Sequence, residues 1–219
     1  MSTTVYTYND KVLVNSANDK WLKKPEVVDY VTIGTQTWKK DYLDIDDGQG
    51  GISTTSQGVK IYTYTAAVRV ASTITGWHIP TPTETAALIS YARNGGGAGS
   101  EWNPLTATTG WPTVTYGGDT RDLNGTNTTG FDLKYFSGVK YSPEWNRGNI
   151  TISNTAIIWE YTDISAGRSE NMRGMIAEWQ WDQRAKVVKY QSNYAINYLG
   201  DGELIEEIKL AVRLIQDSN

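Results

Sequence analysis

Residues 76–84 read GWHIPTPTE, and this stretch predicts a rigid lead-in to a helix. Trp77 and Ile79 alternate as apolar anchors, and the two prolines that follow fix the backbone φ angle. Thr81 or Thr83 can supply the side-chain oxygen that caps a helix N-terminus. Apolar residues then recur at helical spacing, which predicts a helix over residues 85–93 that the three glycines at 95–97 end. Its apolar stripe consists of Ala86, Leu88, Ile89 and Ala92.

This stretch resembles the GWHIPT…E…L core of the Fibrobacter succinogenes major paralogous domain, a family related to the C-type lectin fold. Further segments follow in the family's order: IGTQTW at 33–38, YTYTAA at 62–67, GFDL at 130–133, WE at 159–160 and VRLI at 212–215. The resemblance implies an α+β, C-type-lectin-like fold, with a twisted antiparallel sheet, two flanking helices, long loops and terminal strands side by side. It also implies that Trp38, Trp77, Trp159 and Val212 are largely buried.

The resemblance spans roughly residues 31–217, which predicts one lectin-like domain over residues 27–219 and an N-terminal arm over residues 1–26. The arm has a strand-turn-strand pattern, so we expect a short β arm. Such a segment is too short to bury a core of its own. We therefore expect the arm to attach the protein to other virion proteins or to oligomerise it.

The chain of 219 residues has nine Trp and fourteen Tyr but only two Phe. Trp and Tyr suit half-exposed binding surfaces as well as cores, because each joins a large apolar body to a polar group. A net charge of −4 and the lack of any basic run argue against nucleic-acid binding. No apolar stretch is long enough for membrane insertion, and residues 1–11 lack the apolar segment of an export signal. The absence of cysteine excludes disulfides and thiolate chemistry.

Little in the sequence points to catalysis. His78 is the only histidine, so a catalytic triad would have to use it, and we favour a structural, hydrogen-bonded role. Zinc sites need several His or Cys ligands, which the chain lacks. Paired carboxylates could hydrolyse glycosides, but nothing singles out a pair. The candidates are Glu101, Glu144, Asp163 and Glu178. We expect no enzyme activity, no metal and no cofactor.

The acidic, glycine-rich loop at residues 44–51 has two interpretations. Clustered carboxylates on a flexible loop are typical of calcium sites. The spacing does not follow the EF-hand pattern, because Gly48 stands where another acidic or amide residue is required. We favour an acidic, solvated turn, although the sequence leaves open whether residues 44–47 bind calcium.

A departure from the family bears on where the protein works. The family usually carries two cysteines at the positions of Thr73 and Leu214, and losing both fits folding in a reducing cytoplasm. The chain thus resembles phage virion proteins that display a variable, aromatic-rich face. We expect a homo-oligomeric virion surface protein, a tail-tip or head-fibre component assembled in the bacterial cytoplasm, that binds a host glycan or protein receptor. The alternatives are a capsid decoration or adaptor protein and a glycan-acting hydrolase.

Lectin-like folds bind ligands on the loops between later strands, here residues 95–129, 141–149 and 164–173. Aromatic rings can stack on sugar rings, while Arg bonds to hydroxyls or carboxylates. Trp145 is the strongest choice because its neighbours are polar. In the alternative interpretation, these tryptophans pin the loops to the core. The expected ligand-binding residues are Trp102, Trp111, Tyr116, Trp145 and Arg147.

Overall fold

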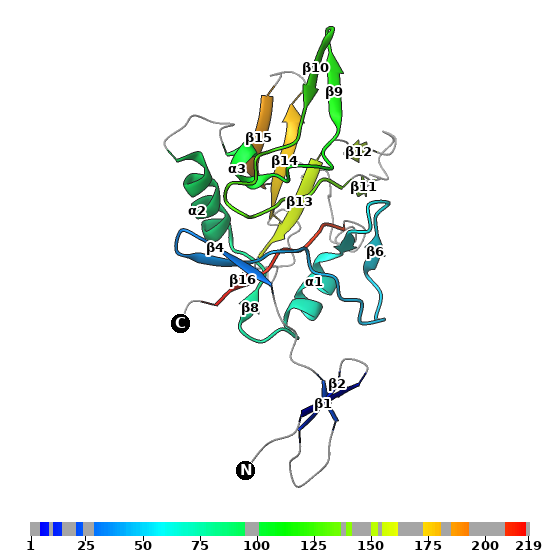
Figure 1. The fold of residues 1–219 in the computed structure, drawn as a ribbon. Coiled ribbons are helices and arrows are strands. Elements are labelled where there is room, and N and C mark those ends of the chain that lie inside the picture. Colours follow the sequence, from blue (N-terminus) through cyan, green and yellow to red (C-terminus); the bar gives the residue numbers. More distant parts are fainter. Residues whose placement is uncertain are drawn as a thin grey trace.

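The structure is a computed structural model, and it describes most of the chain between residues 29 and 217 together with three N-terminal strands (Figure 1). The described ranges are 5–8, 11–14, 21–23, 29–94, 101–136, 139–141, 150–152, 155–161, 173–180, 185–192 and 209–217. Side chains are described within 29–94, 101–136 except Tyr116, and 209–217, and at Ile158, Glu160 and Tyr161.

The N-terminal strands β1 (Val5–Tyr8), β2 (Lys11–Val14) and β3 (Trp21–Lys23) form an antiparallel sheet in chain order. The sequence predicted the first two as strands, and the structure confirms both, while the residues of the predicted turn between them lie outside the described set. Within the described residues, these strands pair only with one another. The division at residue 26 and the role of the arm stay predictions.

A four-stranded antiparallel sheet joins residues from both ends of the main body. Its order is β4 (Tyr30–Ile33), β5 (Gln36–Lys39), β16 (Ile215–Gln216) and β8 (Trp77–His78). In this sheet Ile215 pairs with Trp38 on one side and with His78 on the other. The late strand β16 therefore lies between two early strands.

The predicted helix is α2 (Pro82–Arg93), which begins three residues before the predicted start at Thr85 and is capped by Thr81, one of the two candidate caps. Glu84 completes a capping box by accepting a hydrogen bond from the Thr81 backbone. The described helix ends at Asn94, whose φ of 43° is left-handed, while the glycines at 95–97 lie outside the described residues. Residues 64–71 form a second helix, α1 (Tyr64–Ala71), capped by Thr63.

The remaining elements are short. The first group is β6 (Ile52–Thr54), β7 (Lys60–Tyr62), α3 (Trp102–Leu105), β9 (Thr113–Tyr116) and β10 (Asp119–Asp122). The second is β11 (Val139–Tyr141), β12 (Ile150–Ile152), β13 (Thr155–Glu160), β14 (Arg173–Gln180) and β15 (Ala185–Ser192). All described strand pairs are antiparallel. The chain is thus a mixed α+β protein with small antiparallel sheets. Within the described residues, no helix has the length and hydropathy needed to cross a membrane.

One hydrophobic core underlies the helices and the four-stranded sheet. The predicted burial of Trp38 and Val212 is confirmed, because both are 0% exposed. Trp77 is only half-buried and packs on the edge of this core. The side chain of Trp159 lies outside the described residues.

Arg213 is a buried cation that ties three segments together. Its guanidinium donates to the backbone oxygens of Lys39, Lys40, Phe131 and Asp132. Its carbon Cζ lies 4.6 Å from the ring centre of Phe131 and 4.8 Å from that of Tyr42. Burial lowers the pKa of Arg213 and raises the pKa of the Tyr42 phenol. Arg213 therefore holds the segment before β16 against the start of residues 131–136.

Candidate functional site

Residues 101–136 contain most of the predicted binding loop, and they divide into two parts of opposite character. We call the first part the anchor. It comprises the buried side chains Trp102, Leu105, Trp111, Leu123 and Leu133. We call the second part the hairpin. It comprises residues 113–122, which form β9, a two-glycine turn and β10.

The two tryptophans of the anchor belong to the core. Trp102 is 0% exposed and Trp111 is 4% exposed. Their ring centres lie 4.6 Å apart at an interplanar angle of 63°. Each indole Nε1 donates to a backbone oxygen at 2.9 Å, Trp102 to Leu123 and Trp111 to Leu133. Both polar groups are satisfied inside the protein, so neither indole face is open to a sugar ring. The structure therefore fits the interpretation in which these tryptophans pin the loop to the core.

Backbone hydrogen bonds stiffen the anchor further. The carbonyl of Asn103 accepts from the amides of Thr126 and Asn127, at 2.8 and 3.0 Å. The Gly125 amide donates to the Ala107 carbonyl at 2.8 Å, and Gly125 lies against the backbone of Asn103 and Thr106. A Cβ on Gly125 would come within 2.5 Å of the Thr106 carbonyl oxygen. This close backbone packing makes the anchor a fixed platform for the hairpin.

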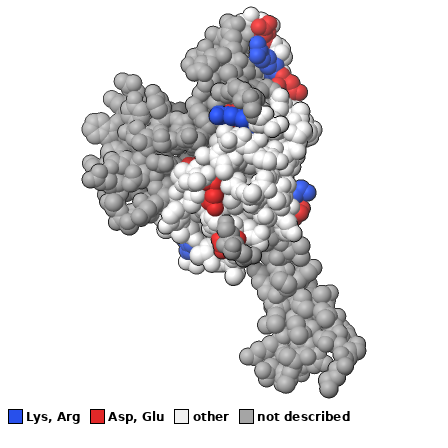
Figure 2. All heavy atoms as spheres, turned by 90° about the vertical axis from the view of Figure 1, so that its left-hand side faces the viewer, with Lys and Arg blue, Asp and Glu red and all other residues white. Residues whose placement is uncertain are grey.

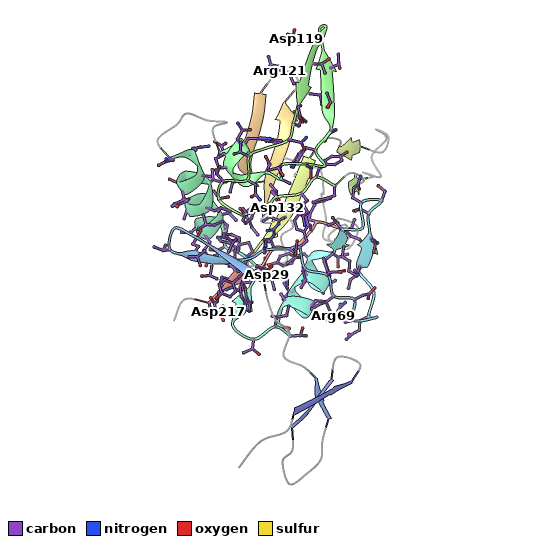
Figure 3. The ribbon with its side chains drawn as sticks, in the orientation of Figure 1. Asp29, Arg69, Asp119, Arg121, Asp132 and Asp217 are labelled. Carbon is purple, nitrogen blue, oxygen red and sulfur yellow. The ribbon has the colours of Figure 1, made fainter. Side chains whose placement is uncertain are left out.

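The hairpin extends away from the anchor and is polar (Figures 1 and 3). Gly117 and Gly118 both have positive φ, as a tight two-residue hairpin turn requires. Val114 is buried and fixes the base of β9, whereas every residue of β10 is exposed. The Thr115 and Thr120 hydroxyls lie 3.2 Å apart across the strands. The hairpin therefore presents hydroxyls and charged groups to solvent.

The charges on the hairpin are mixed. Asp119, Arg121 and Asp122 all lie on β10, and Figure 2 shows acidic and basic side chains close together at the upper end of the molecule. The Asp122 carboxylate also accepts from the Asn124 amide at 2.9 Å, and Asn124 in turn accepts from the Trp111 amide at 3.0 Å. Asp122 therefore links the hairpin to the anchor. The hairpin surface suits hydrogen bonding to a polar partner.

The side chains of the other three predicted binding residues are not among those that the structure describes. Tyr116 lies on β9, but its side chain is outside the described set. Trp145 and Arg147 lie outside the described residues. Their part in binding stays a prediction.

A second polar cluster surrounds His78 on β8. Its Nδ1 lies 2.6 Å from an Asp217 oxygen, and its Nε2 lies 3.1 Å from both oxygens of Glu84. Burial acts to raise the pKa of Glu84. Hydrogen bonds from Thr81 and the contact with His78 outweigh burial, so the pKa lies below its ordinary value. The expected hydrogen-bonded histidine is present, and both of its partners are carboxylates with no hydroxyl or thiol nucleophile among them.

The carboxylates of the acidic loop are engaged by cations and by the loop's own backbone. Asp47 binds the Arg69 guanidinium at 2.6 Å, and Asp44 binds Lys60. Asp46 accepts from the Gly48 amide at 2.9 Å. Throughout the described ranges, no group of three or more acidic, histidine or cysteine side chains is arranged to hold a metal ion. This arrangement favours a structured turn.

The carboxylates considered for glycoside hydrolysis do not come together as a described pair. Glu101 is fully buried and accepts from Arg93 at 3.1 Å, which links it to the last turn of α2. Glu144, Asp163 and the side chain of Glu178 lie outside the described set.

The hairpin was missed by sequence reasoning, although a signal for it exists. Residues 113–122 read TVTYGGDTRD, in which two glycines separate two short segments rich in threonine. A Gly-Gly pair between β-forming segments is a recognised hairpin pattern. The partnership of His78 with Asp217 had no such signal, because 139 residues separate them.

Comparisons of the chain with models of protein families, with curated proteins and with solved structures gave no match.

Proposed function

We propose that this protein is a phage virion surface component, at a tail tip or in a head fibre, whose lectin-like domain binds a receptor on the bacterial surface. The observation that carries the proposal is the exposed hairpin, because it is held on a buried anchor. A rigid support with a polar, projecting tip is suited to recognition of an external partner.

The C-type-lectin-like assignment is part of this proposal. It draws support from the motifs of residues 33–38, 76–84 and 212–215, which resemble one family. All three contribute to the four-stranded sheet or to the start of α2. Pairing of β5 with β16 agrees with terminal strands that lie side by side, as that fold requires.

The proposed ligand contact differs from simple ring stacking. Trp102 and Trp111 are buried, so the hairpin would contact a receptor through the paired hydroxyls of Thr115 and Thr120 on one face of the ribbon and the charge of Arg121 on the other. A glycan carries the hydroxyl and charged groups that such side chains recognise. Trp145 and Arg147, on the predicted binding loop at residues 141–149, would add an aromatic face and a second cation.

The N-terminal arm would attach the protein to the particle or join copies of it. Its support is the pairing of β1, β2 and β3 with one another, which provides a small sheet distinct from the four-stranded one. A three-stranded sheet of this size gains stability by burying a hydrophobic face, and contact with another copy or another virion protein would bury one.

The test is attachment of the fluorescently labelled, purified full chain to a panel of bacterial cells. The hairpin variant combines Thr115→Ala, Thr120→Ala and Arg121→Ala, and leaves Asp122 in place because it holds Asn124. Lys40→Ala is the matched control, since it removes an exposed cation that pairs with Asp29 at 3.4 Å. We expect the hairpin variant to lose at least about tenfold in affinity, while its free energy of unfolding changes by less than about 1 kcal/mol.

Each of the other possible results of the attachment test leads to a different conclusion about function. Equal attachment by the hairpin variant would remove the hairpin from the site. Failure of the wild-type chain to bind any cell or purified envelope glycan would favour a decoration or adaptor protein. Shortening of a bound glycan during incubation would identify a hydrolase.

Trp145 gives an independent test of the predicted binding loop at residues 141–149. We expect Trp145→Ala to weaken attachment with little change in the melting temperature, because the residues around it are polar. A large drop in melting temperature would instead place Trp145 in the core. Unchanged attachment would remove it from the binding face.

A further inference from the structure

The four-stranded sheet has an open edge at β4. This strand is the outermost of the sheet, and among the described residues it pairs only with β5. Figure 1 shows β4, in blue, along the left-hand side of the main body. The opposite edge is the two-residue strand β8, and just beyond it the Tyr161 amide donates to the Pro80 carbonyl at 2.7 Å. The sheet can therefore be extended at β4.

The backbone groups of two β4 residues, Tyr30 and Thr32, point out of the sheet. Opposite Tyr30 on β5, the Lys39 amide donates to the Leu214 carbonyl at 2.9 Å and so bonds toward the β16 side. Bonded and non-bonded pairs alternate along an antiparallel ladder. The amides and carbonyls of Tyr30 and Thr32 consequently face away from β5, where another strand can bond to them.

The side chains of β4 favour strand pairing. The strand reads YVTI, so every residue is aromatic or β-branched and none is charged. Tyr30 is 60% exposed, and Thr32 is exposed as well. Natural sheets usually protect an exposed edge with lysine, proline or a bulge, and β4 has none of these. The exposed strand β10 of the hairpin, in contrast, is charged at three of its four positions.

The edge of β4 is complementary to a second copy of itself. When two β4 strands lie antiparallel about a twofold axis at Val31, Tyr30 of each strand faces Thr32 of the other. Each such pair exchanges both of its backbone hydrogen bonds and places an aromatic side chain beside a β-branched one.

The neighbouring registers fit less well. One of them places Tyr30 opposite Gly34, whose φ of 62° belongs to the turn between β4 and β5. The other places Thr32 opposite a position two residues before β4 begins. The register centred on Val31 is the one in which both outward-facing residues of each strand meet residues of the partner strand.

We propose that β4 is an interface at which two copies of the chain pair edge to edge and join their four-stranded sheets into one. The contact is separate from the hairpin and from the N-terminal arm, to which the proposed function gives other roles. A strand pair of this length buries less than the roughly 1,200 Å² of a standard interface, so we expect a dissociation constant of about 10–100 µM.

Engineered cysteines test the register, because the chain contains no cysteine of its own. Tyr30→Cys and Thr32→Cys are made as separate full-length variants and oxidised with diamide, each alone and both mixed. In the proposed register these two positions face each other with Cα atoms about 5.5 Å apart, within the range of a disulfide. Two copies of one variant instead place their cysteines on a diagonal of about 7–8 Å, which is too long.

We expect the mixture to give at least about fivefold more cross-linked dimer than either variant alone, as the two separations require. Equal cross-linking by a single variant would exclude the register. No cross-linking at a protein concentration of about 500 µM, well above the expected dissociation constant, would exclude the interface.

Sedimentation equilibrium measures the association without cross-linking. Thr32→Lys adds a charge to the edge, and Thr32→Pro removes an outward amide that the ladder with β5 does not use. Both variants should raise the dissociation constant at least about tenfold. Thr108→Lys makes the same charge change at an exposed threonine outside the sheet, so it should keep the wild-type value.

The remaining outcomes separate this interface from assembly through the arm. If Thr32→Pro lowers the melting temperature, Thr32→Lys alone decides. A wild-type chain that stays monomeric at every concentration would overturn the proposal. An oligomer that persists in Thr32→Lys and gives no cross-link at β4 would also overturn it, while leaving the proposed role of the arm intact.

Discussion

The anchor and the hairpin are adjacent in the sequence but differ in almost every physical property. The anchor buries two indoles whose N–H groups are satisfied by backbone oxygens. The hairpin exposes all four residues of β10 and contributes one buried apolar side chain, Val114. The comparison teaches that aromatic residues in a long loop support a surface here, while small polar residues form it.

The largest effect is expected from removing an indole of the anchor, which tests whether the anchor supports the core. Trp102→Ala should lower the free energy of unfolding by about 3–5 kcal/mol, because a fully buried tryptophan leaves a large cavity. Urea denaturation measures the loss. Tyr30→Ala is the control, since Tyr30 is 60% exposed and its truncation should cost less than about 1 kcal/mol. A Trp102→Ala protein of unchanged stability that no longer attached to cells would return Trp102 to the binding site.

Two glycines, one in each region, compare how tightly the backbone is packed in the anchor and in the hairpin. Gly125→Ala in the anchor would drive its Cβ to within 2.8 Å of two carbonyl oxygens, so we expect a loss of about 3 kcal/mol. Gly118→Ala at the hairpin tip meets nothing within 4 Å. It should cost only about 1 kcal/mol, through its positive φ. Thermal unfolding of both variants measures the two losses of stability. A larger loss for Gly118→Ala would show that the backbone is packed more tightly in the hairpin than in the anchor.

Acid tests an exposed ion pair beside the anchor, between Asp41 and Lys134, with the smallest expected effect. A hydrogen bond from Lys134 lowers the pKa of Asp41 below its ordinary value of 3.8. Asp41 is then charged and stabilising above that ordinary value, and its contribution is lost as the pH falls through the lowered pKa. Because the Asp41 side chain is 62% exposed, we expect a contribution below about 0.5 kcal/mol.

Urea denaturation of the wild type and Asp41→Asn at pH 7 and pH 2.5 measures that contribution. The difference between the two proteins should shrink at the lower pH. A difference that grew as the pH fell would contradict the assignment of the pair.

Local signals in the sequence predicted local structure well. The capping of α2 follows from Thr81 and Pro82, because these residues act within one turn of chain. The first arm strands likewise depend on near neighbours. The coarse α+β class was implied by the family resemblance, which rests on several separate motifs.

Exposure and long-range pairing were not predictable in this way. Trp102 has the polar neighbours Glu101 and Asn103, yet it and Trp111 are buried, and their indoles donate to the backbone oxygens of Leu123 and Leu133, which follow later in the chain. The contacts of Arg213 and Asp217 join residues more than 80 positions apart. No local pattern encodes such contacts, because they arise only when the whole core assembles.

The interior place of β16 has a consequence for the synthesis of this protein. Arg213 and the Lys39 carbonyl that it binds are 174 residues apart, so β5 emerges long before the segment that completes its sheet. At a translation rate of about 5–20 residues per second, that interval is roughly 10–35 s. During it, the unpaired edge of β5 can pair with a strand from another nascent chain. Polysomes are therefore where this protein is most exposed to aggregation, and chaperones that shield strand edges should act there.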